Sequence, residues 1–159
     1  MLTRFPGAEH LQNIHPLTVH FPVAFLAGAV LLYLLAWLLR KDHLAVTAFT
    51  CLALGALAAL ASVGTGLYAE PGVMVSRSVR TRLLHQHKEL MLWTASLAVV
   101  LAAWAAIARP FPSKGRPLFF FLLLAMLVIM AFGSDYGARM VYDYNAGGNA
   151  CPQPIEFSQ

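Results

Sequence analysis

Residues 17–39 read LTVHFPVAFLAGAVLLYLLAWLL, a stretch without a single acidic residue, lysine or arginine. A helix of about 20 apolar residues crosses the ~30 Å hydrocarbon core of a bilayer. The stretch ends at Arg40, Lys41 and Asp42, whose charges belong at the membrane surface. It therefore predicts a transmembrane helix.

Three more apolar runs follow. The fourth, after Pro117, is purely apolar only to Phe132. We expect this helix to continue through Gly133 to Tyr142, with Asp135 and Arg139 paired one turn apart, because charges inside a membrane are usually paired. The alternative is that it stops at Phe132. The predicted fold is all-α, an integral membrane up-and-down four-helix bundle. It has one domain over residues 1–148, spans near 17–39, 44–68, 87–108 and 118–141, and an irregular tail over 149–159.

The composition supports lipid as the solvent. Of the 159 residues, 59% are hydrophobic and 11% are charged, against about 25% charged in soluble domains. The formal net charge is +4, but the basic residues flank apolar runs, as in the loops of membrane proteins. We therefore expect a lipid partner and no nucleic acid.

Four spans place both termini on one side of the membrane. The two short turns on the other side are densely basic and contain Arg40, Lys41, Arg109, Lys114 and Arg116. The positive-inside rule makes those turns cytoplasmic, which places the termini on the periplasmic side.

The histidines are concentrated on the terminus side: only His43 falls on the other side. His10 and His15 precede His20 at the first span, and His85 and His87 begin the third span after a long loop expected over residues 69–89. In an up-and-down bundle these two helix starts share one membrane face. We therefore expect histidines from separate helices to converge.

Helical rotation suggests which histidines point inward. At 100° per residue, His15 and His20 lie ~140° apart. Pro16 disfavours a helical conformation at His15, so His15 is interpreted as a boundary residue and His20 as the ligand. His85 and His87 lie ~200° apart. His87 shares an apolar helix face with Met91, so His87 is predicted to point inward and His85 outward.

Two imidazoles facing each other in a four-helix bundle are suited to axial ligation of haem iron. We predict one haem b held by His20 and His87. Gly66 gives room for the macrocycle, Arg139 meets its propionates with help from Arg80 or Arg82, and Asp135 orients a ligand histidine. The predicted role is a non-catalytic electron-transfer subunit. It passes electrons along one face between quinol and a cytochrome c, or to other subunits of a redox complex.

Two other classes stay open. One is a cofactor-free structural or assembly subunit whose histidines anchor the helices. The other is a metal-site or transport protein in which His20, His87 and Asp135 hold a transition metal. The sequence has no HExxH motif, Walker loop or dinucleotide fingerprint, so a metalloprotease or nucleotide-dependent enzyme is not expected.

Residues 15–24, HPLTVHFPVA, resemble the opening signature HPxxVHFPIA of a bacterial membrane family, domain of unknown function 2231. The resemblance covers about residues 13–148 and includes the TGL stretch at Thr65 and the entry to the third span at His87. It implies a bacterial inner-membrane protein and functional roles for His15, His20 and one of His85 or His87. The family's histidine pattern is similar to that of small four-helix b-type cytochromes, which again implies haem.

Overall fold

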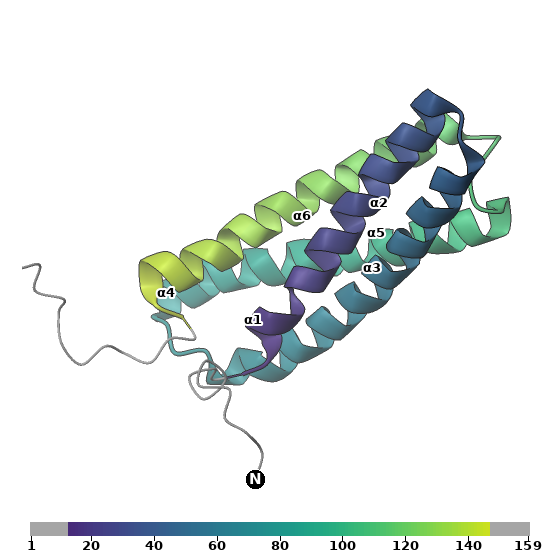
Figure 1. The fold of residues 1–159 in the computed structure, drawn as a ribbon. Helices are drawn as coiled ribbons and strands as arrows, with labels where there is room; N and C mark the ends of the chain where they lie inside the picture. Colours follow the sequence, from purple (N-terminus) through teal and green to yellow (C-terminus); the bar gives the residue numbers. More distant parts are fainter. Residues whose placement is uncertain (1–12, 147–159) are drawn as a thin grey trace, which may run out of the picture.

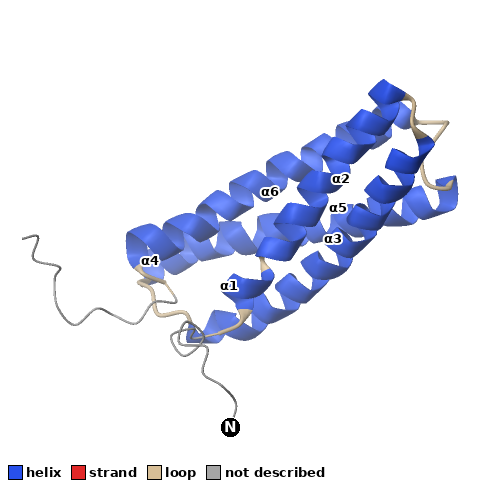
Figure 2. Ribbon diagram, viewed as in Figure 1, coloured by secondary structure: helices blue, strands red, loops and turns tan. Residues whose placement is uncertain are grey.

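The computed structural model describes residues 13–146. Within that range the chain forms helices and short connections and no strand (Figures 1 and 2). His10 and the tail expected over 149–159 lie outside the described residues. The helical elements are α1 (His15–Thr18), α2 (His20–Leu39), α3 (Asp42–Ala69), η1 (Glu70–Gly72), α4 (Arg77–Val79), η2 (Arg80–Leu84), α5 (His85–Ala108) and α6 (Arg116–Tyr144).

Joined end to end, these elements make four helices long and apolar enough to cross a membrane. They run over His15–Leu39, Asp42–Gly72, Arg77–Ala108 and Arg116–Tyr144. Around the bundle, α2 packs on α3, α3 on α5 and α5 on α6, while α2 and α6 touch over a smaller area. The predicted up-and-down four-helix membrane bundle is confirmed. The short element α1 and the element α4 lie at one end, opposite the two short turns (Figure 1).

The end with the short turns is tightly packed. Tyr33 and Phe119 are fully buried there, with ring centroids 5.1 Å apart. The Tyr33 hydroxyl donates to the Pro110 carbonyl at 3.0 Å, which ties α2 to the turn between α5 and α6. Trp104 packs edge-on against Phe119 as well. This end is therefore a closed aromatic core.

The third membrane helix begins earlier than predicted. The loop expected over residues 69–89 is helical from Arg77 onward. Ser76 caps this start, because its hydroxyl accepts from the Val79 amide at 3.4 Å. Val79, Leu83 and Leu84 then pack against Met140 of α6. These buried contacts stabilise the start of the helix. The polar residues between Val79 and Leu84 had made this segment read as a loop in the sequence.

The first membrane helix is broken near its start. Val19 separates α1 from α2, and Pro22 lies four residues after Thr18. Proline has no N–H to donate to the carbonyl four residues earlier, so the Thr18 carbonyl has no helical partner. Val19 keeps helical backbone angles (φ −64°, ψ −22°), so α1 and α2 form one membrane span, His15–Leu39.

The fourth helix runs without interruption to Tyr144, which confirms its extension beyond Phe132. The predicted ion pair within it is wrong. Arg139 lies 3.7 Å from Asp143, not beside Asp135. Both acids are one turn from Arg139, and the long arginine side chain extends toward the helix end, where its charge reaches water.

Candidate functional site

Two histidines from different helices meet at the α1 end of the bundle. His15 of α1 and His87 of α5 have ring centroids 6.3 Å apart, with ring planes at 78°. Both residues are half-buried, whereas His20 and His85 are exposed. The interpretation of His20 as the inward residue is therefore wrong: His15 faces His87 in its place.

The local backbone explains why His15, and not His20, lies at the site. Pro16 occupies the first turn of α1, a position that proline tolerates, so His15 enters the helix. The ring of His15 then lies against Gly66 of α3, where an added Cβ would be 2.9 Å from its Cε1 atom. Gly66 thus makes room for an imidazole, rather than for the face of a macrocycle as predicted.

His87 is held from α6. Its Nδ1 lies 2.7 Å from the Gly133 carbonyl oxygen. A carbonyl only accepts, so in the neutral ring Nδ1 carries the proton and the lone pair remains on Nε2. Gly137 is equally close: an added Cβ there would be 2.9 Å from the His87 Cε1. The glycines of α6 therefore fix the position and tautomer of His87.

Two threonines hold His15 in a similar way. Its Nδ1 lies 3.1 Å from the Thr65 hydroxyl, which is 3.0 Å from the Thr18 hydroxyl. Thr65 donates to the Ser62 carbonyl at 3.0 Å, and Thr18 donates to the His15 carbonyl at 2.9 Å. The donor in the contact between Nδ1 and Thr65 depends on the tautomer of His15. With the proton on Nδ1, the lone pair of His15 is left on Nε2, as in His87.

A third hydroxyl on α3, that of Ser62, has no hydrogen-bond partner among the described residues. Ser62 is 7% exposed, and its Oγ makes no hydrogen bond with the described residues. Ser62 is one turn before Gly66, on the same helix face. Sequence reasoning missed Thr18, Ser62 and Thr65 as parts of the site. One feature of the sequence could have indicated them. All three are hydroxyl residues inside otherwise apolar spans, close in sequence to His15 or Gly66.

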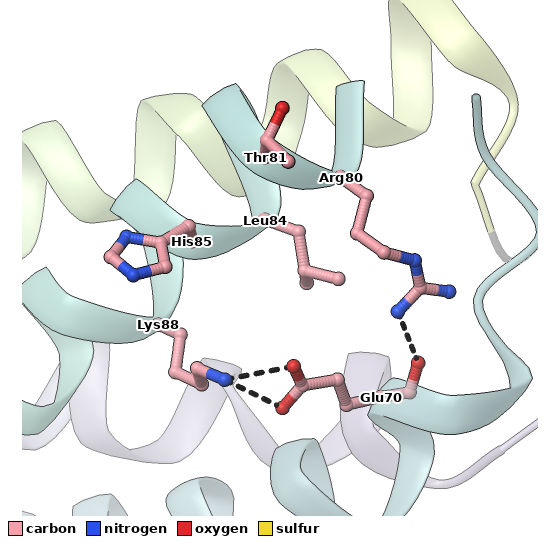
Figure 3. A pocket seen from close by; sticks show the side chains of 6 residues that line it. All are labelled: Glu70, Arg80, Thr81, Leu84, His85 and Lys88. Carbon is pink, nitrogen blue, oxygen red and sulfur yellow. Dashed lines mark hydrogen bonds and ion pairs between the residues drawn. The ribbon is translucent and has the colours of Figure 1, made fainter. Parts of the chain in front are cut away.

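A charged hollow of about 150 Å³ lies at the same end. Figure 3 shows Lys88 reaching Glu70 at the end of α3, with distances of 2.8 and 3.0 Å from its Nζ to the two carboxylate oxygens. Arg80 donates only to carbonyls, those of Glu70 at 3.3 Å and Val73 at 2.6 Å. Its positive charge is therefore not neutralised by a carboxylate of the described residues, whereas Arg139 is paired with Asp143.

The outward-facing histidine belongs to this charged surface. His85 lines the hollow, and its Nδ1 is 3.6 Å from Glu89. Arg82 is also exposed. Neither this hollow nor an open one on α6, lined by Val128, Ala131, Phe132 and Asp135, includes His15 or His87.

The donor set of the site is two imidazoles. Within residues 13–146, no three histidine, cysteine or acidic side chains are close enough to hold a metal ion together. The site of His20, His87 and Asp135 is therefore not formed there. Asp135 is exposed on α6 and, at 200° from both Gly133 and Gly137, lies on the helix face away from His87.

These features define a multi-pass membrane protein, a four-helix bundle with a histidine pair at one end. The chain belongs to the DUF2231 family, described as a predicted membrane protein, whose family model matches residues 11–150. The resemblance noted in the HPxxVHFP opening is thereby confirmed. No curated protein and no solved structure matches the chain.

Proposed function

We propose that this protein is a haem b-binding electron-transfer subunit of the bacterial inner membrane, in which His15 and His87 would hold the haem iron. One observation carries the proposal. The two imidazoles face each other across the bundle, and each uses Nδ1 for a hydrogen bond to a neighbouring helix. Nε2 of His87 then carries the lone pair, and Nε2 of His15 does so when Nδ1 holds the proton, so that both would be available to bind a metal.

The spacing and the number of donors fit haem iron. The two ring centroids lie 6.3 Å apart, close enough for His15 and His87 to hold one metal ion between them. Two side chains are too few for a structural zinc site, which takes four. Haem iron brings the porphyrin nitrogens with it and lacks only axial ligands.

The surroundings support the same ligand. A carbonyl that accepts from Nδ1 orients a ligating histidine and raises its basicity, as the Gly133 carbonyl does for His87. The unpartnered hydroxyl of Ser62 is a donor available beside the pair. Arg80 offers an uncompensated cation at the same end for the propionates, the role that the sequence had suggested for Arg139.

When bound, haem would supply one-electron transfer; the chain would supply His15 and His87 as its ligands. A single centre near one face does not bridge the ~30 Å hydrocarbon core. Electrons would therefore move along the terminus-side face, which we place in the periplasm. Quinol, a cytochrome c or another subunit of a redox complex are the partners this arrangement suits.

The test is the absorption spectrum of purified protein expressed with ample haem precursor, oxidised and then reduced. We expect a Soret band and a low-spin α band. His15→Ala and His87→Ala should abolish both, whereas the matched controls His20→Ala and His85→Ala should keep them. Added imidazole should restore the bands in a variant that folds without its ligand. Loss in His20→Ala with retention in His15→Ala would refute the assignment.

A second candidate is a cofactor-free structural subunit. The observation in its favour is that each imidazole already links two helices, His15 to α3 and His87 to α6. Hydrogen bonds between membrane helices contribute about 0.6 kcal/mol each. In that case the protein is colourless despite ample haem, and both alanine variants change only the free energy of unfolding.

A further inference from the structure

The charged hollow lies between two neighbouring membrane helices at the terminus-side end. Glu70 closes the second helix, and the other lining residues belong to the start of the third. Figure 3 shows Arg80 and Lys88 extending from the third helix toward Glu70, with Leu84 between them. The hollow of about 150 Å³ is lined by Glu70, Arg80, Thr81, Leu84, His85 and Lys88.

The charges that line the hollow do not balance. Lys88 and Glu70 neutralise each other, with Nζ 2.8 Å from the carboxylate. Arg80 donates to two backbone carbonyls, at 3.3 and 2.6 Å. Those acceptors carry no net charge, and a guanidinium has more N–H groups than two bonds use. His85 is 3.6 Å from Glu89, an acid outside the hollow. Arg80 therefore leaves one positive charge and free donors at the hollow.

The surroundings of the hollow add to its positive potential. Arg77 and Arg82 are exposed on the same short segment as Arg80. Neither forms an ion pair with a carboxylate of residues 13–146. The segment lies where the second membrane helix ends and the third begins, which is the level of the lipid headgroups on either side of the hydrocarbon core. An anion at the membrane surface is thus the ligand that the charges favour.

The helices on both sides of the hollow expose apolar side chains one turn further into the membrane. Leu67 precedes Glu70 by three residues and is 48% exposed, and Leu92 follows Lys88 by four and is 42% exposed. Residues at these spacings share a helix face, and α3 packs on α5. A free phosphate ion would touch neither leucine. A phospholipid with its phosphate in the hollow would place its acyl chains along both.

We propose that the charged hollow binds the phosphate of an acidic phospholipid. Arg80 donates to the phosphate oxygens in charge-assisted hydrogen bonds, and the acyl chains lie along Leu67 and Leu92. Basic pockets between membrane helices bind acidic lipid headgroups in this way. Neither His15 nor His87 lines the hollow, so this proposal does not rest on haem. Because Arg80 is also the cation suggested for the propionates, the experiment uses protein prepared without haem.

The test is native mass spectrometry of the full-length protein, released from a neutral detergent after titration with dioleoyl phosphatidylglycerol or dioleoyl phosphatidylcholine. We expect one phosphatidylglycerol to bind at concentrations at which phosphatidylcholine does not. Arg80→Gln removes the charge and should weaken this binding about tenfold, whereas Arg80→Lys keeps the charge and should lose less. The matched control is Arg82→Gln. It removes the same charge from an exposed neighbour outside the hollow and should bind nearly as the wild type does.

A gain in affinity gives the sharper readout. Glu70→Gln removes the acid that lines the hollow and frees the charge of Lys88, so it should bind phosphatidylglycerol several-fold more tightly. A loss of structure cannot produce that gain. Size-exclusion profiles establish that all variants are folded.

Three results would overturn the proposal. Equal affinity in wild type and Arg80→Gln removes the assigned donor. Equal weakening in Arg80→Gln and Arg82→Gln shows attraction to a basic surface without a site. Calorimetric binding of inorganic phosphate as tight as that of the lipid leaves no role for the acyl chains.

Discussion

At the scale of single residues, glycines shape the histidine site because they leave space for the imidazole rings. Gly66 and Gly137 each lie against an imidazole, with space for no Cβ. Gly64, two residues from Gly66, has no atom within 4 Å of an added Cβ. The same residue type therefore has two different roles in one short segment, and only close approach distinguishes them.

Replacing these glycines should show the difference. Gly66→Ala forces the His15 ring to move and should lower the free energy of unfolding by about 1–3 kcal/mol. Gly64→Ala should leave it unchanged or raise it by up to about 1 kcal/mol, because alanine favours helix. Unfolding of both variants in mixed micelles measures this. Similar effects at the two positions would contradict the packing of His15 on Gly66.

The threonine that holds His15 gives a second prediction. Thr65→Val removes the hydroxyl that is hydrogen-bonded to Nδ1 of His15 with little change in shape. The expected loss is about 1 kcal/mol of unfolding free energy. In the His15→Ala background the same substitution should cost much less, so a double-mutant cycle isolates the interaction. Independent, additive losses would show that the two side chains are not coupled.

At the scale of elements, a proline sets the direction of His15. Pro22 removes one backbone hydrogen bond and allows α1 to turn away from α2. Pro22→Ala should restore that bond and extend α2 toward residue 15. His15 would then shift relative to His87, because the restored bond would change the angle between α1 and α2.

Cross-linking measures this shift. The hydroxyls of Thr18 and Thr65 are 3.0 Å apart, so cysteines at both positions should form a disulfide in a background with Cys51→Ser and Cys151→Ser. The yield should fall several-fold when Pro22→Ala is added. An undiminished yield would mean that the break at Val19 has another cause.

At the scale of the whole molecule, stability and the histidine site lie at opposite ends. The aromatic core around Phe119 closes the end with the short turns, and the polar pair His15–His87 lies at the other. Phe119→Ala should cost about 3–5 kcal/mol of unfolding free energy. The absorption bands expected of the bound haem should keep their positions in the folded fraction. A shift in those bands would show that the two ends are coupled.

The sequence by itself determined the membrane, the number of spans and the end at which the histidines gather. Long apolar runs and their charged borders are local properties, and helix direction in an up-and-down bundle follows from counting spans. The inward direction of His87 also followed from Met91, its neighbour along one helix face, because α5 is a regular α-helix from His85 onward.

Only the tertiary structure decided which histidine meets His87. The choice between His15 and His20 depends on the space that Gly66 of α3 leaves for the His15 ring, a feature that the rotation of a single helix does not contain. The same holds for Asp143 as the partner of Arg139 and for the helical start at Arg77, which is stabilised by contacts with α6. Close packing between helices is a property of pairs of segments, and no single segment encodes it.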